Sequence, residues 1–269
     1  MSVALESGLD PEEILNSSLE ILYDYQPITL ASTGSVFTYT LKSSFADHSS
    51  EALQTVTLRT PDTDASNWSL HASSVWASSK YLADNLDDLH LKDHISRRRS
   101  GNKNDKVRVL ELGAGAGLPG IVIAKSYPEI HVTISDYPDE QLIRTISGNI
   151  ENNRVSANCY AKAYAWGSGP VVLLGDHSDS SSNLFDRTLR RTSDSRAHLV
   201  VGLHTGRYTL QSFMDAVLQV GLVIVSLEER ERSGTIKREW DVTRAEHEDE
   251  KERRRWLLWI ELKWPDSIL

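Results

Sequence analysis

A glycine-rich bend between two strand-like runs is the part of the sequence best suited to bind a ligand. The segment VLELGAGAGLPGIVIAKSYPEIHVTISDY, residues 109–137, is typical of an apolar strand, a bend, a helix and a second strand that ends at Asp136. Alternate glycines at 113, 115 and 117 permit a sharp turn and let a ligand lie against bare main chain. Asp136 follows about 20 residues later, where a carboxylate accepts hydrogen bonds from ribose hydroxyls. The segment predicts a site for an adenosine-bearing cofactor.

Two cofactors fit this layout, a dinucleotide such as NAD and S-adenosylmethionine (SAM). GAGLPG at 115–120 matches the dinucleotide pattern G-x-G-x-x-G. Glu111 favours SAM, because a carboxylate is unfavourable beside a diphosphate and favourable beside an ammonium or a sulfonium. Trp166, in the AWG that follows the third strand-like run, offers a flat indole to an adenine ring, although an ordinary packed aromatic explains it better when it is taken alone. We predict SAM, with NAD as the minor alternative.

The pattern around the bend predicts an α/β domain. Strand-like runs (VRVLEL, HVTISD, ANCYAKAYAW, AHLVVGLH, GLVIVSLEER) alternate with helical runs from residue 107 onward, as in parallel βαβ units wrapped by helices. The closing run RRRWLLWIELKW is expected to form an antiparallel end with the run before it. EHEDEKERRR at 246–255 is interpreted as a solvated turn or short helix with internal ion pairs, and SRRRSGNKNDK at 96–106 as a polar loop.

An N-terminal extension, residues 1–66, is predicted to precede the main domain, residues 67–269. Residues 10–23 have the start signals of a helix, and VFTYTLK and LQTVTLR have the composition of a β-hairpin. A helical pattern then covers residues 70–86, with apolar residues at 75, 82 and 86.

Composition narrows the class of protein. A formal net charge of −9 over 269 residues disfavours a nucleic-acid partner, since phosphate backbones recruit surplus Lys and Arg. Cys159 is the one cysteine, so no internal disulfide and no Cys-rich zinc site is expected, and we predict no metal. The sequence has no run of roughly 20 apolar residues and no signal-peptide pattern at its start. These features predict a cytoplasmic protein without a membrane partner.

Four strings, in the order HASSVWASSKYLAD, VLELGAGAGLPGI, SDYPDEQLI and YAWG, resemble the seven-strand SAM-dependent methyltransferases of the lysine methyltransferase group. The nearest likeness is to the fungal branch that modifies the N-terminus and adjacent lysine of translation elongation factor 1-alpha, whose members are often labelled nicotinamide N-methyltransferase-like. The resemblance implies a Rossmann-like class I sheet of seven strands with helices on both faces. It also implies transfer of a methyl group from SAM to a lysine or N-terminal amine of a protein, with elongation factor 1-alpha as a candidate partner.

The resemblance also implies roles for individual residues around the cofactor. Trp76 would wall the pocket, Asp136 would hold the ribose and Trp166 would cover the adenine, while a core aromatic on an amphipathic helix is an equal account of Trp76. The remaining cofactor contacts would come from the main chain of the bend, at Gly113, Ala114 and Gly115.

The sequence departs from the family on the substrate side. A Phe-Asp that begins a central apolar strand in the family is matched at residues 185–186, but the polar run RTLRRTSD follows. Either VVLLGD at 171–176 takes that place, with Asp176 at its carboxyl end, or the segment is truncated and catalysis is impaired. His204, where a strand gives way to a helix, is the second substrate-side candidate, and a histidine satisfied by that helix start is the alternative. No catalytic base is assigned. The rival functions are a nicotinamide-type small-molecule N-methyltransferase and a catalytically impaired SAM-binding module.

Overall fold

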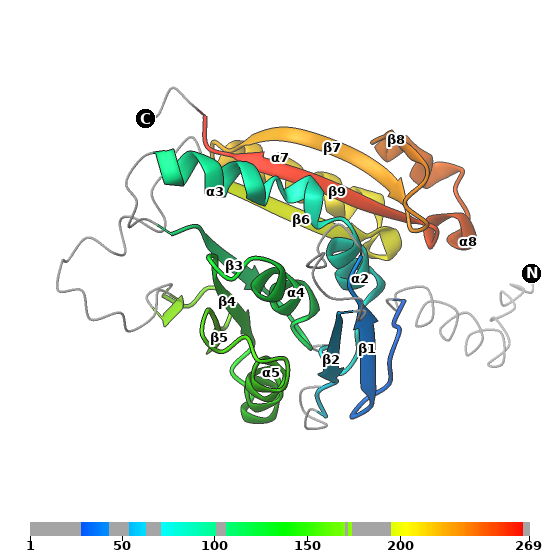
Figure 1. The fold of residues 1–269 in the computed structure, drawn as a ribbon. Coiled ribbons are helices and arrows are strands. Elements are labelled where there is room, and N and C mark those ends of the chain that lie inside the picture. Colours follow the sequence, from blue (N-terminus) through cyan, green and yellow to red (C-terminus); the bar gives the residue numbers. More distant parts are fainter. Residues whose placement is uncertain are drawn as a thin grey trace, which may run out of the picture.

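The computed structural model describes residues 28–42, 54–62, 71–100, 106–169, 172–173 and 195–265. The helix predicted at residues 10–23 and the strand candidates at 171–176 and 185–186 fall wholly or largely outside these ranges. Within them the strands form a two-stranded, a three-stranded and a four-stranded sheet (Figure 1). No helix of the described part is long and apolar enough to cross a membrane.

The glycine-rich bend belongs to the three-stranded parallel sheet. β3 (Arg108–Leu112), β4 (His131–Asp136) and β5 (Cys159–Ala163) lie side by side in that order, joined by α4 (Leu118–Ser126) and α5 (Glu140–Asn152). Asp139 caps α5, since its Oδ1 accepts from the Leu142 N–H at 2.8 Å. The predicted succession of strand, bend, helix and strand is therefore confirmed, with β5 ending at 163 rather than running on to 166.

The C-terminal third forms the four-stranded antiparallel sheet, with the order β6-β9-β7-β8. Its strands are β6 (Arg196–Gly202), β7 (Val223–Glu231), β8 (Lys237–Glu239) and β9 (Trp256–Lys263), and α7 (Arg207–Gln219) packs on them through Leu210, Met214 and Val217. β7 pairs antiparallel with β9, as expected for the end of the chain. The segment before β9 contains the 3₁₀ helix η5 (Val242–Glu246) and the short helix α8 (Glu250–Arg253), where Arg254 pairs with Glu250 as predicted.

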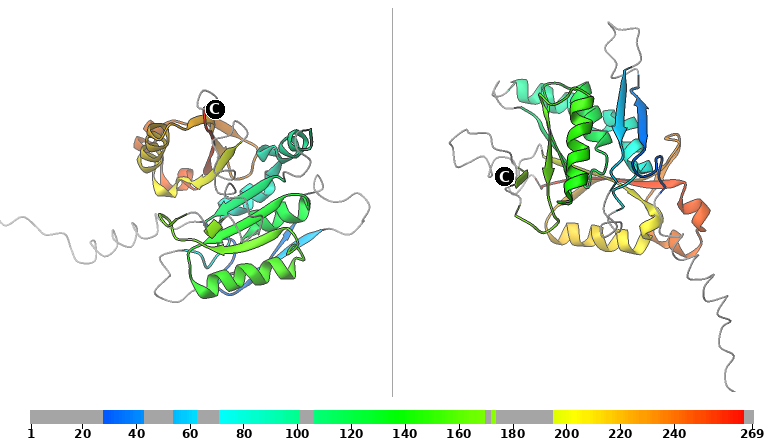
Figure 2. Two further views of the ribbon diagram at one scale, coloured as in Figure 1. Left: turned by 90° about the vertical axis from the view of Figure 1, so that its left-hand side faces the viewer. Right: turned by 90° about the horizontal axis from the view of Figure 1, so that it is seen from below.

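The described residues form an α/β fold in which the predicted single sheet of seven strands is not continuous. β3 and β6 are edge strands of two separate sheets, and no described strand pairs with both of them. Figure 2 shows the two sheets as separate layers. Between β5 and β6 the sequence has one short apolar run, VVLL at 171–174, and is mostly polar after it, whereas a central parallel strand, buried on both faces, is apolar. The seven-strand detail stays a prediction.

The predicted hairpin is present as β1 (Val36–Thr40) and β2 (Thr55–Arg59). Two side-chain amides, one in α5 and one directly after it, pair with the free edge of β2. Asn149 bonds to the N–H and C=O of Arg59 at 2.8 and 2.9 Å, and Asn153 does the same to Thr57 at 3.0 and 2.7 Å. Val56 and Leu58 are fully buried in the same core as α4. The hairpin thus shares its core with the parallel sheet, and the domain boundary at residue 66 stays a prediction.

The helix predicted over residues 70–86 begins later than expected. α2 spans Ala77–Asp84, and η2 (Leu86–Leu89) and α3 (Leu91–Ser100) follow, so that part of the predicted loop at 96–106 is helical. Val75 and Trp76 are extended and not helical, because they pair with the chain at 28–30. Thr29 forms a bridge with Trp76, and the Leu30 N–H donates to the Val75 carbonyl at 2.8 Å. α2 packs against both α4 and β6 and so joins the two larger sheets.

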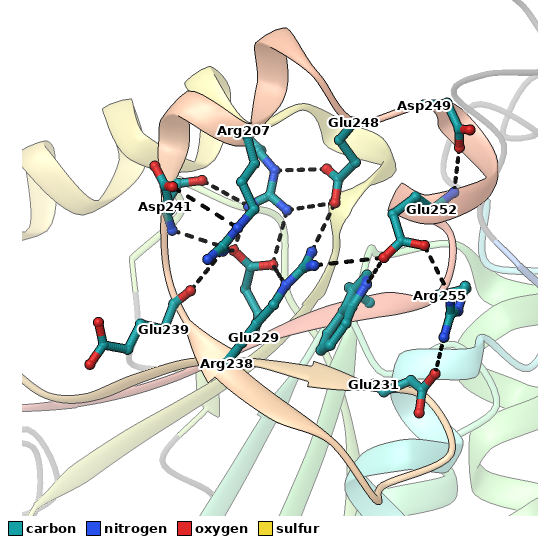
Figure 3. Close-up of polar contacts among 12 residues, drawn as sticks. Arg207, Glu229, Glu231, Arg238, Glu239, Asp241, Glu248, Asp249, Glu252 and Arg255 are labelled. Carbon is teal, nitrogen blue, oxygen red and sulfur yellow. Dashed lines mark hydrogen bonds and ion pairs between the residues drawn. The ribbon is translucent and has the colours of Figure 1, made fainter.

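A buried charge network fixes the segment from β8 to α8. The Arg207 guanidinium donates to both carboxylate oxygens of Glu229, to both of Glu248 and to the Asp241 carbonyl, which uses all five of its N–H groups. The side chains of Arg207 and Glu229 are fully buried. Arg238 also donates to Glu229 (Figure 3). Arg244 is a further donor to the same carboxylate. Burial by itself raises the pKa of Glu229, but the hydrogen bonds from Arg207 and Arg238 outweigh it and lower that pKa. The network holds η5 and α8 against α7 and β7.

Candidate functional site

The bend after β3 has the backbone that its glycines allow. Gly113, Gly115 and Gly117 have φ of +64°, +55° and +80°, in the left-handed region that other residues avoid. A Cβ built on Gly113 meets nothing within 4 Å, so the chain is open to a ligand at that point. A Cβ on Gly115 would lie 3.5 Å and 3.6 Å from the carbonyls of Ala72 and Ser74, which places the bend beside the segment that leads into α2.

Asp136, at the carboxyl end of β4, is bonded to the bend. Its Oδ2 accepts from the Gly115 N–H at 2.6 Å and its Oδ1 from the Tyr137 N–H at 2.7 Å. Burial raises the pKa of Asp136, against the opposing effect of these two N–H groups. Since a carboxylate oxygen has two lone pairs, each oxygen retains capacity for one further donor. The carboxylate is held in place and can still accept two hydroxyl groups.

The Glu111 carboxyl group, predicted to lie beside the cofactor, is bonded to the start of α4. Its Oε2 accepts from the Gly120 N–H at 2.9 Å, and a Cβ on Gly120 would lie only 2.5 Å from that oxygen. Burial, with a smaller effect of Asp136, raises the pKa of Glu111 to about 8, so the carboxyl is largely protonated at neutral pH. A full negative charge at Glu111 therefore does not distinguish the two cofactors. Glu111 disfavours a dinucleotide in another way, because it occupies an N–H in the first turn of α4, where a dinucleotide places its diphosphate.

Trp166 lies in the turn that follows β5, and β5 is the neighbour of β4, the strand that ends at Asp136. The Tyr164 N–H donates to the Asp136 carbonyl at 2.8 Å, which ties this turn to the end of β4. The Trp166 side chain is 74% exposed. This exposure does not agree with the alternative of a packed core aromatic. It agrees with an indole whose flat face is open to a ligand.

Trp76 and His204 lie together at a second place. Trp76 immediately precedes α2 and donates from Nε1 to the His71 carbonyl at 2.8 Å, and its ring meets the His204 ring edge-on, with centroids 6.0 Å apart. His204 lies in η4 (Leu203–Thr205), directly after β6. Within the described chain its imidazole makes no hydrogen bond, so the alternative of a histidine satisfied by the helix start is not supported; Thr205 instead donates to the Gly202 carbonyl.

The environment keeps His204 neutral. Burial, and then the charges of Arg254 and His71, lower its pKa. Its ring lies back over Gly202, where a Cβ would be 2.4 Å from Nδ1. An uncharged imidazole has one unprotonated ring nitrogen, which can accept a hydrogen bond.

These two residues line a small pocket that is open to solvent, together with Arg232, Arg253 and Arg254. The predicted residues therefore fall into two groups, the bend with Asp136 and Trp166, and the pocket with Trp76 and His204. Trp76, which the resemblance assigned to the cofactor, thus lies with the substrate-side candidate His204. Residues 72–76 connect the groups. Asp176 lies outside the described residues. The sequence analysis missed the arginines; the RRR at 253–255 was their one visible signal. Among the described residues no cluster of three His, Cys, Asp or Glu is placed to hold a metal ion.

Comparisons with known proteins agree with the resemblance inferred from the sequence. Residues 62–180 match the lysine methyltransferase family. The chain is 34% identical over 123 residues to the "Protein N-terminal and lysine N-methyltransferase efm7" of Schizosaccharomyces pombe, covering 44% of this chain and 42% of that protein. It is 30% identical over 126 residues to the protein of the same description from Gibberella zeae, covering 43% of each. The matches thus span less than half of either relative.

Solved structures of methyltransferases are similar at low sequence identity. The N-terminal domain of human METTL16 in complex with SAH is 10% identical, with a TM-score of 0.39, over 67% of this chain and 70% of that one. Precorrin-6y C5,15-methyltransferase from Geobacter metallireducens is 12% identical, with a TM-score of 0.37, over 60% of this chain and 81% of that one.

Proposed function

Because residues 62–180 match the lysine methyltransferase family, we propose that this protein is a SAM-dependent N-methyltransferase that acts on a lysine or N-terminal amine of another protein. The carrying observation is the glycine bend bonded to Asp136, which lies inside the matched residues. The names of the two fungal relatives support a protein amine as the acceptor. Elongation factor 1-alpha, a cytoplasmic protein, is the first substrate to test.

The residues present fit the cofactor. Gly113 offers bare main chain beside open space, whereas Ala114 is buried and Gly115 lies against the segment before α2. Asp136 can accept ribose hydroxyls, and the exposed Trp166 indole can cover an adenine. SAM supplies the electrophilic methyl group when it is bound.

The acceptor amine must lose its proton before it can act as a nucleophile. Trp76 forms one wall of the pocket and gives the amine an apolar surface, which favours the neutral form. His204 is uncharged and has ring nitrogens without a hydrogen bond to the described chain, so its unprotonated nitrogen can accept a hydrogen bond from the amine. We place His204 on the substrate side for this reason.

Transfer of label tests the proposal. The purified chain is incubated with methyl-labelled SAM and, separately, with recombinant elongation factor 1-alpha, cell extract and nicotinamide. We expect label in protein, and intact-mass analysis then gives the number of methyl groups on the factor. Label in low-mass products alone would establish the small-molecule N-methyltransferase instead.

A SAM-binding module without turnover is the second candidate, favoured by the break between β3 and β6 in the described residues. Calorimetric titration with S-adenosylhomocysteine (SAH) distinguishes it: binding without label transfer to any acceptor supports the module. No binding of SAH rejects both SAM-dependent readings, and the same titration with NADH tests the dinucleotide.

A further inference from the structure

The pocket beside Trp76 has a cationic lining in an acidic chain. Arg232, Arg253 and Arg254 line it together with His204, and its described lining contains no Asp or Glu side chain. The whole chain carries a formal net charge of −9. Three arginines in a pocket whose described lining has no carboxylate thus run against the overall charge balance of the chain.

Two of these arginines have no carboxylate partner among the described residues. In the described part of the chain Arg254 pairs with Glu250, whereas Arg232 and Arg253 form no ion pair. The other described arginines from β6 onward all have one: Arg196, Arg207, Arg230, Arg238, Arg244 and Arg255. Burial also lowers the pKa of Arg232. An unpaired and partly desolvated guanidinium is costly, and an external anion offsets that cost.

The backbone around these arginines is fixed. The Arg232 N–H donates to the Arg255 carbonyl at 2.9 Å, which joins the end of β7 to the turn before β9. Asp249 caps α8, because its Oδ1 accepts from the Glu252 N–H at 2.7 Å. Glu248, just before α8, belongs to the buried network (Figure 3). The guanidinium groups therefore start from rigid positions.

The pocket adjoins the proposed transfer site. Trp76 and Ser78 line it at the start of α2, and Ser74 lies against the glycine bend. Yet a substrate amine is a cation until it loses its proton, and arginines repel it. The arginine side of the pocket must therefore receive another part of the substrate.

We propose that Arg232 and Arg253 bind a carboxylate side chain of the protein substrate, an Asp or Glu close in sequence to the amine, and so select an acidic context for methylation. This inference rests on the proposed function. The carboxylate neutralises the arginines and leaves the amine beside Trp76 and His204.

Titration with hexaglutamate, and with hexaglutamine as the uncharged control, tests the site. We expect the full chain to bind hexaglutamate in preference to hexaglutamine, and Arg232→Gln and Arg253→Gln each to weaken hexaglutamate binding about tenfold, as loss of a charge-assisted hydrogen bond does. Arg99→Gln removes the same charge from an exposed arginine of α3 that does not line the pocket, and it should leave the affinity unchanged.

Titration of SAH into the same preparations separates the two proposals. If all variants bind SAH equally and Arg253→Gln binds hexaglutamate as Arg99→Gln does, the acidic-context inference fails and the proposed function stands. If the wild type does not bind SAH, the proposed function fails, and with it the substrate role of the pocket. Inorganic phosphate that binds more tightly than hexaglutamate at the same arginines would overturn the assignment of a carboxylate. A raised KM for the labelled protein substrate in Arg253→Gln, with unchanged SAH affinity, supports the inference.

Discussion

The Oδ2 atom of Asp136 lies 2.6 Å from the Gly115 backbone nitrogen, so the end of β4 and the bend after β3 form one unit. The carboxylate positions the bend and at the same time presents its remaining lone pairs outward. If this unit holds the cofactor ribose, a substitution of Asp136 disturbs both the position of the bend and the contact with the ribose.

Asp136→Asn should weaken SAH binding about tenfold or more. The amide keeps the size of the side chain but loses the charge, and hydrogen bonds to charged groups contribute about 1.5–3 kcal/mol. Calorimetric titration measures the affinity. Asp93→Asn, on the exposed face of α3, is the matched control and should bind as the wild type does. Equal affinities of the two variants would remove Asp136 from the cofactor site.

Replacement of Glu111 by Gln should stabilise the protein at alkaline pH. The pKa of Glu111 is raised in the folded chain to about 8 from 4.5, so its contribution to stability is full below pH 4.5 and is lost as pH rises through 8. Gln cannot ionise, and its Oε1 can still accept from the Gly120 N–H. We expect the free energy of unfolding to rise by roughly 2–4 kcal/mol at pH 9 and to change little at pH 5. Denaturant unfolding at both pH values measures this, and a gain of the same size at pH 5 would contradict the assignment.

The strand, the bend and Asp136 were predictable because they are local. Alternate glycines after an apolar run specify a turn within a few residues, and the acid lies at the end of the next strand. The direction of Glu111 was not predictable, since it depends on how closely α4 approaches β3. The backbone hydrogen bond between Arg232 and Arg255 was not predictable either. These two segments meet only because Glu231 lies opposite Trp256 in the β7–β9 register. Trp76 was expected inside a helix, but pairing with residues 28–30 keeps it just before one.

Loss of Arg207 should destabilise the fold and with it the pocket. Arg207→Ala leaves Glu229 fully buried with fewer partners, and breaking a buried ion pair costs about 3–5 kcal/mol. Arg238 and Arg244 still donate to Glu229, so we expect the lower end of this range. Arg144→Ala breaks an exposed pair within α5 and should cost no more than about 1 kcal/mol. Urea unfolding of the two variants compares these costs, and similar midpoints would show that the network contributes little.

A methyl group added at Gly202 tests the position of His204 without changing its chemistry. The Cβ of Gly202→Ala would lie 2.4 Å from Nδ1 of His204, far inside contact distance, so the imidazole must move away from its place beside Trp76. We expect methyl transfer to the protein substrate to fall at least about tenfold, because a small displacement of a positioned group is costly to catalysis.

The affinity for SAH should not change in Gly202→Ala, since Gly202 and His204 lie apart from the bend and Asp136. Gly148→Ala is the control for the substitution itself: a Cβ at Gly148 in α5 meets nothing within 4 Å, and alanine is the better helix former there. That variant should retain full activity. If Gly202→Ala is as active as Gly148→Ala, the imidazole at 204 has no part in presenting the amine, and the substrate side of the site must be sought elsewhere along the edge that Trp76 shares with the bend.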